Sequence, residues 1–265
     1  MQREDAPFSG KVWEKIDEAV VNSAKAQLAG RRLLHIEGPY GLGLKSLPGS
    51  DQAAEGASAV GASLAVSRAL PVVAIRSEFA LAARDVAAFE ETGMPLDVVG
   101  AASAAIACAR QEDDLIFYGS KSLGVEGLLT AKGTLSVKLN PWGEVGKAAD
   151  DIIQAVTKLD SAGFHGPYSL ALAPDMYNLL LRRYPQGDST EMEHLRQIVT
   201  DGIVKAPALS GGSVLLASGA QFAAIVVGQD LAAGFVGPSN GGYEFTVSES
   251  VTLRLLQASS VCVLR

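Results

Sequence analysis

Three consecutive acidic residues near the middle of the chain are the residues that most resemble a metal site. Glu112, Asp113 and Asp114 end an alanine-rich segment and are followed by Ile116-Phe117-Tyr118 and a glycine. Carboxylate oxygens are the ligands that Mg²⁺ and Ca²⁺ prefer. Successive side chains of a helix point about 100° apart, so neighbouring acids do not converge on one ion. The spacing therefore predicts a rigid corner over residues 111–129, and no metal site.

The histidines are the second candidate for metal chemistry. His35, His165 and His194 lie far apart, and only Glu191 and His194 have a spacing that places them on one helical face. A di-iron bundle would need a second Glu-x-x-His and glutamates from two further helices, which the chain does not supply. We interpret the pair as part of a solvated helix face; the alternative is that it lines a pore formed by symmetry.

Motifs for nucleotide binding and nucleophilic catalysis are incomplete. Residues 38–46 read GPYGLGLKS, one residue away from GxxxxGK[ST], but Leu44 separates the second glycine from the lysine. The chain has no GxSxG, although a Ser/His/Asp set assembled from distant residues stays open. Cys108 and Cys262 are isolated, and we interpret them as buried thiols. We expect no catalytic residue, no metal and no cofactor.

Composition limits the partners of the chain. It has 265 residues, 48% of them hydrophobic and 19% charged, which is enough for a sizeable core. A net charge of −7 argues against nucleic acid or an anionic membrane as the main partner, because these need clustered Lys and Arg. The charged N-terminus lacks the apolar core of a signal peptide, and no run is long enough to span a bilayer. We expect a cytoplasmic protein.

The elements that must position these residues follow from periodicity and from Gly and Pro punctuation. Gly119 stands where a C-terminal cap of the long central helix is expected. Helices are expected within residues 1–30 and at 81–91, 97–118, 147–161, 174–183 and 191–200, and strands at 33–36, 71–79, 168–173, 213–217, 222–227, 242–256 and 261–264.

Residues 42–69 interrupt this pattern. They are small, polar and low in complexity, with few side chains able to anchor a core. A loop of this length is uncommon in a compact domain and is usually functional or disordered. We expect an extended excursion from the domain, and a further possibility is that a neighbouring subunit covers it.

Six short blocks recur in an order that is specific when they are taken together. The blocks are HIEGPYG at 35–41, MPLD at 94–97, QEDDLIFYG at 111–119, GVEGLL at 124–129, GPY at 166–168 and GQD at 228–230. In their order and context they resemble the encapsulin shell proteins, and the resemblance runs from about Trp13 to Leu264.

The resemblance implies an α+β chain with the tailed-phage major-capsid fold, which has an N-terminal helix, an E-loop, a P-domain and an A-domain. It places the N-terminal helix and arm at residues 1–41 and the E-loop at 42–78. The P-domain, with its spine helix, is discontinuous at 79–135 and 215–260, and the A-domain covers 136–214. The E-loop lies across a neighbouring subunit in the family, which agrees with the small core of residues 42–69.

The resemblance also implies a docking site on the inner wall for a cargo protein with a C-terminal targeting peptide. Leucine and phenylalanine would supply an apolar groove there, and Arg31 would pair with a charge or the carboxylate of the cargo. The matching positions are Leu28, Arg31, Leu33, His35, Leu231 and Phe235.

A turn in the expected A-domain matches the family's loop around the five-fold pore. A ring of Asp188 would make a polar opening that tolerates cations, whereas an ordinary solvated turn is the alternative. The turn consists of Tyr184, Pro185, Gln186, Gly187, Asp188 and Ser189.

Function would then follow from self-assembly. The short excursion resembles that of relatives with 60-subunit, T=1 shells, and blocks 94–97 and 111–119 resemble the branch with ferritin-like, iron-oxidising cargo. The alternatives are a shell for a dye-decolourising peroxidase, a phage or prophage capsid protein, or a bacteriocin or protease. Some relatives bind flavin through an aromatic residue near the position of Arg84; the chain has none there, so we expect no flavin.

Overall fold

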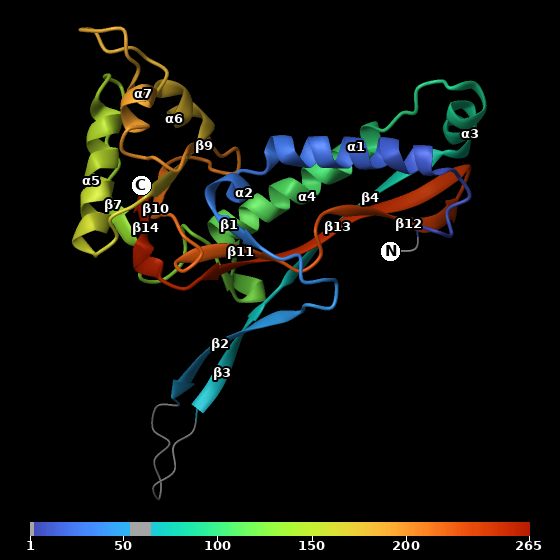
Figure 1. The fold of residues 1–265 in the computed structure, drawn as a ribbon, viewed down its shortest axis with the longest axis horizontal. Helices are drawn as coiled ribbons and strands as arrows, with labels where there is room; N and C mark the ends of the chain where they lie inside the picture. Colours follow the sequence, from blue (N-terminus) through green and yellow to red (C-terminus); the bar gives the residue numbers. More distant parts are fainter. Residues whose placement is uncertain (1–2, 54–64) are drawn as a thin grey trace, which may run out of the picture.

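A computed structural model describes residues 3–53 and 65–265 of the chain. Two β-sheets lie side by side, each covered by helices, and a two-stranded hairpin extends away from both (Figure 1). The first described residues lie at the end of the molecule opposite the C-terminus (Figure 1). None of the helices in the described ranges is long and apolar enough to cross a membrane.

The first sheet is organised around the long strand β13, Gly242–Leu255. One edge of β13 pairs with β4, and the other edge pairs first with β12 and then with β11, which in turn carries β1 in parallel. Burial alternates along the first half of β13, as expected for a sheet with one covered face. The partner strands are β1 (His35–Glu37), β4 (Val73–Ala82), β11 (Ala223–Val227) and β12 (Ala232–Ser239).

Two long helices, α1 (Gly10–Gln27) and α4 (Val99–Tyr118), run in roughly the same direction and cover this sheet (Figure 1). The buried residues of α1 recur at intervals of three and four, as the sequence predicts, and form one face of the helix. α4 buries mainly small side chains over most of its length, and small side chains let neighbouring backbones approach closely. These are Ala101, Ala104, Ala105, Cys108 and Ala109.

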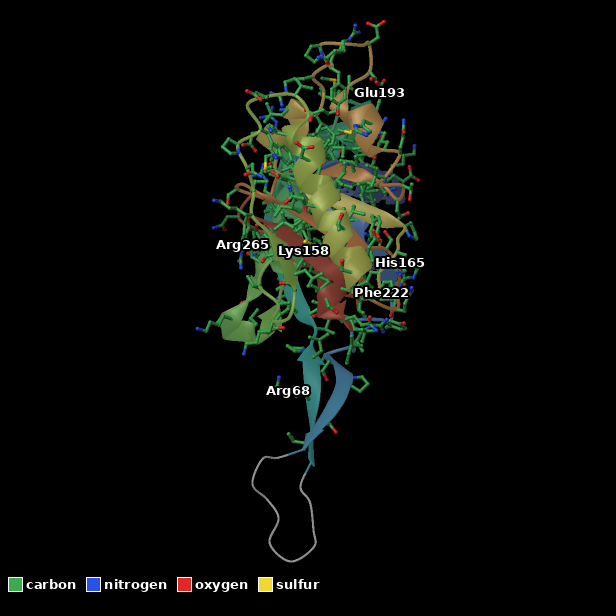
Figure 2. The ribbon with its side chains drawn as sticks, turned by 90° about the vertical axis from the view of Figure 1, so that its left-hand side faces the viewer. Arg68, Lys158, His165, Glu193, Phe222 and Arg265 are labelled. Carbon is green, nitrogen blue, oxygen red and sulfur yellow. The ribbon has the colours of Figure 1, made fainter. Side chains whose placement is uncertain are left out.

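The second sheet has the strand order β7-β14-β10-β8-β9 and packs against α5. Strands β8 and β10 are buried at every residue, which explains why both read as continuous apolar runs. Figure 2 shows α5, with Lys158, on the outer side of this part of the molecule. The elements are β7 (Leu135–Val137), α5 (Lys147–Ser161), β8 (Tyr168–Leu172), α6 (Pro174–Leu179), α7 (Glu191–Leu195), β9 (Ile203–Lys205), β10 (Ser213–Ala217) and β14 (Val261–Leu264).

The expected excursion forms a hairpin where it is described. Strands β2 (Ser46–Ala53) and β3 (Ala65–Pro71) pair in antiparallel fashion and point away from both sheets (Figure 1). Val66 is 61% exposed on β3. The tip, residues 54–64, lies outside the described residues. The described hairpin therefore supplies no core of its own, as the composition of residues 42–69 predicts.

Some predicted boundaries are wrong for identifiable reasons. The strand expected at 33–36 starts only at His35, because residues 30–33 form the short helix α2. Helices α6 and α7 are shorter than the predicted 174–183 and 191–200. The helix expected at 81–91 is α3, Ala83–Thr92, since β4 continues to Ala82. Strand β12 was not predicted, because its Gly and Pro residues resemble a turn; it carries a register shift at Phe235/Gly237.

The corner after α4 is a close-packed turn. Gly119 ends α4 with a φ of 69°, a conformation that favours glycine. Strands β5 (Gly119–Ser120) and β6 (Val125–Glu126), joined by the 3₁₀ turn Lys121–Leu123, bring Gly127 against the backbone of Gly119. Thr130 Oγ1 donates to Tyr118 O at 2.9 Å and accepts from Gly127 N at 3.0 Å.

We predict that Gly127→Ala destabilises the protein much more than Gly124→Ala. A Cβ at Gly127 would overlap the backbone of Tyr118 and Gly119, whereas one at Gly124 meets open space and is opposed only by its φ of 70°. Overpacking costs roughly 3 kcal/mol and the left-handed backbone roughly 1 kcal/mol. Thermal unfolding at matched protein concentration should show midpoint decreases of about 6–12 °C and 2–4 °C. Equal decreases would show that the corner relaxes around an added methyl group.

Candidate functional site

Arg31 lies at the centre of a largely buried ion cluster. It belongs to α2, Gly30–Leu33. Its guanidinium donates to Glu112 Oε1 at 2.8 Å and Oε2 at 2.8 Å, to Glu249 Oε2 at 2.8 Å, and to Asp230 Oδ1 at 2.7 Å. Glu112 comes from α4, Glu249 from β13, and Asp230 from the turn before β12. The cluster therefore joins four segments that are distant in the sequence.

The cluster holds more negative than positive charge. Glu112 and Glu249 have fully buried side chains, whereas the side chain of Asp230 is 59% exposed. Burial, followed by the nearby Glu112 carboxylate, raises the pKa of Glu249 to about 9 against the opposing effect of Arg31. Within the described residues, Glu249 Oε1 has no hydrogen-bond partner. The geometry thus favours a protonated Glu249 at neutral pH.

Asp113 connects α4 to the N-terminal end of α2. Its carboxylate accepts from Ala29 N and Gly30 N, both at 2.8 Å. Burial raises the pKa of Asp113 to about 6, although these two N–H groups oppose the rise. A Cβ at Gly30 would lie 3.2 Å from both Asp113 Oδ1 and Ile116 Cγ2. Glycine at this position therefore permits the close approach of α2 to α4.

The run of acids diverges as its spacing predicts. Glu112 binds Arg31 and Asp113 binds backbone N–H groups, while Asp114 is exposed beside Arg110 in a hollow of about 350 Å³. In the part of the chain that the structure describes, no group of three or more His, Cys, Asp or Glu side chains is placed to hold a metal ion. The stretch functions as a structural corner of the fold.

The structure brings together only part of the predicted cargo-binding set. Asp230 Oδ1 accepts from both Arg31 and Leu231 N, which places these two residues at one point. Arg31 is thus already paired within the chain. Leu28 and Leu33 are 6% and 3% exposed and belong to the hydrophobic core.

His35 and Phe235 make other contacts. His35 is exposed at the start of β1 and lines a hollow of about 380 Å³ with Asp201 and Ser218. Ser169 Oγ donates to Asp201 and lies 2.7 Å from Ser218 Oγ, and no described hydrogen bond joins His35 to this group. Phe235 on β12 is half-buried in an aromatic cluster with Phe8.

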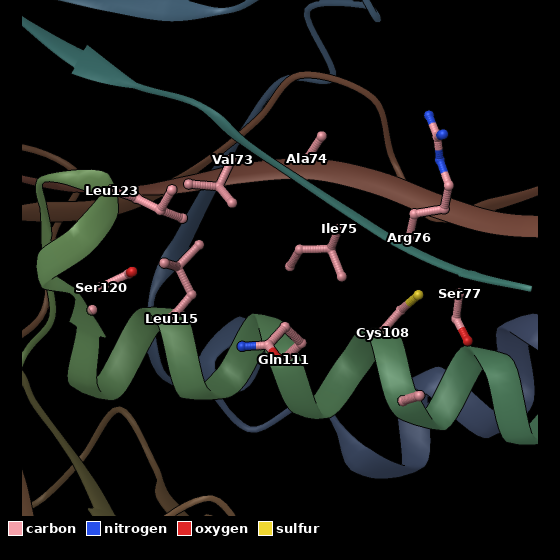
Figure 3. A pocket seen from close by; sticks show the side chains of 12 residues that line it. Val73, Ala74, Ile75, Arg76, Ser77, Cys108, Gln111, Leu115, Ser120 and Leu123 are labelled. Atoms are coloured by element: carbon pink, nitrogen blue, oxygen red, sulfur yellow. The ribbon is translucent and has the colours of Figure 1, made fainter.

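A third hollow lies between α4 and β4. It measures about 520 Å³, and Val73, Leu115 and Leu123 gather at one end, while Arg76 points away from α4 (Figure 3). Cys108 also lines it, but burial raises the pKa of this thiol to about 12. The thiol is therefore unsuited to act as a nucleophile.

The predicted pore loop is an exposed hairpin turn. Arg183 and Thr190 form an isolated bridge at its base, and Tyr184 N donates to Ser189 O at 3.0 Å. Gly187 N closes the turn on Tyr184 O at 3.2 Å. The side chain of Asp188 is fully exposed, 3.7 Å from Arg183. The loop projects beyond α7 at the far end of the second sheet (Figure 1).

The interpretation of Glu191 and His194 as a solvated face is wrong for Glu191. This side chain is fully buried, accepts from Gly146 N at 2.7 Å and pairs with Arg182. His194 Nδ1 lies 2.9 Å from the hydroxyl of Tyr184. The two residues hold the base of the loop, a role that depends on Gly146 and Arg182 and cannot be recognised from helical spacing.

Sequence reasoning did not identify Glu249 as a member of the ion cluster or Phe8 as a neighbour of Phe235. Burial alternates along β13, and Glu249 stands at a position that this alternation places in the interior. An acidic residue at such a position needs a buried partner, and this signal could have identified Glu249. Phe8 precedes the first helix and shows no periodicity of its own.

We predict that Glu249→Gln removes a pH dependence from stability. The folded-state pKa of about 9 exceeds that of the unfolded chain, so Glu249 stabilises the fold fully below about pH 4.5. This contribution is lost as the pH rises toward 9, with a slope of up to about 1.4 kcal/mol per pH unit. We therefore compare the thermal unfolding midpoints of the Glu249→Gln variant and the original chain. The midpoint of the variant minus that of the original chain should rise between pH 5 and pH 9.

Glu244→Gln is the matched control, because Glu244 is an exposed glutamate on the same strand. The thermal unfolding midpoint of this control should equal that of the original chain at every pH. A difference that stays constant with pH for Glu249→Gln would show that Glu249 does not bind the proton.

The chain matches one family model over most of its length. The model is described as encapsulating protein for peroxidase and matches residues 1–252. The chain is 35% identical to the type 1 encapsulin shell protein EncA of Myxococcus xanthus, over 97% of this chain and 93% of that protein. It is 28% identical to the type 1 encapsulin shell protein of Rhodococcus erythropolis, over 98% and 97% of the two chains.

Solved structures confirm the predicted fold. The virus-like particle of Pyrococcus furiosus matches with a TM-score of 0.76 at 21% identity, over 96% of this chain and 99% of that one. The capsid of Myoviridae phage XM1 matches with a TM-score of 0.60 at 12% identity, over 87% and 88%. The α+β major-capsid fold is thus shown. The matches to the family model and to the shell proteins show a structural, non-enzymatic role. By its match to the family model and to these relatives, the chain belongs to the type 1 encapsulin shell proteins.

Proposed function

We propose that the chain assembles with itself into a closed icosahedral shell of 60 subunits, T=1, that encloses a cargo enzyme. The observation that carries this proposal is the similarity to shell proteins over nearly the whole chain, at 35% identity with one of them. The short segment 42–69 supports the small shell, because relatives with larger shells tend to have longer segments there. We place the shell in the cytoplasm, without a nucleic acid or membrane partner.

The exposed surface supports self-association. Large apolar side chains are exposed on separate faces: around the hairpin, at the turn between α3 and α4, beside the pore loop and on β12. Contacts between the subunits of an oligomer cover such side chains, so they are candidate contacts with neighbouring copies of the chain. These side chains are Tyr40, Leu42, Val66, Met94, Val99, Leu181 and Val236, which are 55–70% exposed.

The four-part division predicted from the sequence remains our proposal for this shell. The N-terminal arm at 1–41 and the P-domain at 79–135 and 215–260 would contain the sheet around β13, and the A-domain at 136–214 would carry the pore loop. The E-loop at 42–78 would reach across a neighbour, which agrees with the protruding β2–β3 hairpin.

The cargo we propose is a ferritin-like, iron-oxidising protein, so the shell would serve iron storage and protection from oxidative stress. The resemblance of blocks 94–97 and 111–119 supports this choice. A dye-decolourising peroxidase is the second candidate, which the description of the matching family model favours. In both cases a C-terminal peptide would dock near Leu231 and Phe235 on the inner wall, next to the Arg31 cluster.

Assembly is tested on the purified protein. Size-exclusion chromatography and negative-stain microscopy should show particles of megadalton mass and uniform diameter. Their symmetry and diameter, compared with standards of known subunit number, distinguish T=1 from a larger shell. A stable monomer or dimer would contradict the proposal.

We predict that Asp188→Asn slows cation uptake through the five-fold pore. Five copies of an exposed carboxylate around one axis would concentrate cations at the opening, and the amide would remove this attraction. In shells reassembled around calcein, quenching by external Co²⁺ should slow several-fold at low salt, and the difference should shrink at high salt. Asp85→Asn, an exposed acid on α3, changes the net charge equally and should leave the rate unchanged. Equal rates for all three shells would contradict the assignment of the pore.

A further inference from the structure

Phe235, a predicted cargo-binding residue, is covered by the chain's own N-terminal segment. The ring of Phe8 lies 5.9 Å from that of Phe235, 5.7 Å from Trp13 and 5.4 Å from Tyr243. A fourth ring, Phe245, lies 5.8 Å away. Phe8 therefore occupies an aromatic pocket built by α1, β12 and β13. Any ligand that reaches Phe235 through this pocket must displace Phe8.

Arg3 anchors the other end of the same segment. Its guanidinium donates to the two carboxylate oxygens of Asp17 at 2.7 and 2.6 Å, and to Ala233 O at 3.1 and 3.0 Å. It also lies 4.5 Å from the centre of the Trp13 ring. Ala233 belongs to β12, whose only described partner strand is β13, so Arg3 covers part of a sheet edge that is available for pairing.

Side chains, and not backbone pairing, hold this segment to the body. Residues 3–9 contain no helix or strand. Among the described residues, the backbone hydrogen bonds of residues 3–8 stay within the segment, with Ala6 N donating to Arg3 O. Glu4, Asp5 and Pro7 are exposed. Ser9 N donates to Glu90 Oε1 at 2.6 Å and fixes the end of the segment next to α1. Release of residues 3–8 therefore requires the loss of the Arg3 and Phe8 contacts, together with the packing of Ala6, and leaves the sheets and helices intact.

We propose that residues 3–9 form a displaceable strap over a peptide-binding groove, and that the targeting peptide of the cargo competes with the strap for this groove. The groove presents a carboxylate, an edge carbonyl and an aromatic pocket. Together these suit an extended peptide that carries a cationic side chain and, after four intervening residues, an aromatic or large apolar side chain. The inference rests on the proposed function, because it assigns a regulatory role to the cargo dock of the shell.

The sequence of the strap itself can be used as the probe peptide. Green fluorescent protein carrying residues 3–9 (REDAPFS) at its C-terminus is coexpressed with the shell, and the fluorescence retained per purified shell is measured. Shells with Arg3→Ala and Phe8→Ala combined should retain at least several-fold more fluorescence than the original shells. The same fusion with Phe8→Ala in the peptide should be retained at background level.

Two further shells keep the result interpretable. Arg3→Ala alone, which leaves Phe8 in its pocket, should give an intermediate increase, and it serves if the double variant does not assemble. Glu4→Ala, an exposed change in the same segment, should match the original. Two results would contradict the proposed strap. One is equal fluorescence in the original, single-variant and double-variant shells. The other is equal retention of the two fusion peptides, with and without Phe8→Ala. Absence of particles from the original chain in the microscope would instead contradict the proposed shell.

Discussion

The ion cluster around Arg31 is the interaction on which the arrangement of the N-terminal arm depends. Arg31 forms a buried ion pair with Glu112 and donates a hydrogen bond to Glu249, and removing either contact would leave a buried polar group without its partner. α2, α4 and β13 are therefore held in one relative position. Asp113 adds a second connection through the backbone of Ala29 and Gly30. Because α2 is held on α4, β1 can pair with β11 and lead the chain out toward the hairpin.

Small residues and aromatic residues form the packing contacts in different parts of the molecule. Alanines on α4 and glycines at its C-terminal corner allow backbones to lie close together, which explains how a chain with only 6% aromatic residues builds a core. Several of those aromatic residues gather at one end of the first sheet, around Phe245. The N-terminal segment depends on that cluster, since it has no backbone pairing with the body.

The fold leaves surface for other subunits and offers little chemistry of its own. The hairpin, the turn at residues 184–189 that is our predicted pore loop, and several apolar side chains are exposed at the surface of the described part of the chain. Its buried titratable groups are occupied by structural roles: Glu191 supports the pore loop, and Cys108 is kept neutral by burial. Such a distribution suits a wall, in which the interfaces between copies matter more than any single pocket.

Local patterns in the sequence determined the elements that rest on short-range order. The long helix ending at Gly119, α5 at 147–161 and the strands 213–217 and 261–264 were predicted because periodicity and glycine stops act over a few residues. The divergence of the three acids follows from helical geometry alone, and the family followed from blocks spread along the chain. Only the tertiary structure decided that Arg31 is paired, that Glu191 is buried and that Phe8 covers Phe235. These contacts join residues up to 227 positions apart, so burial and charge compensation there depend on the completed fold.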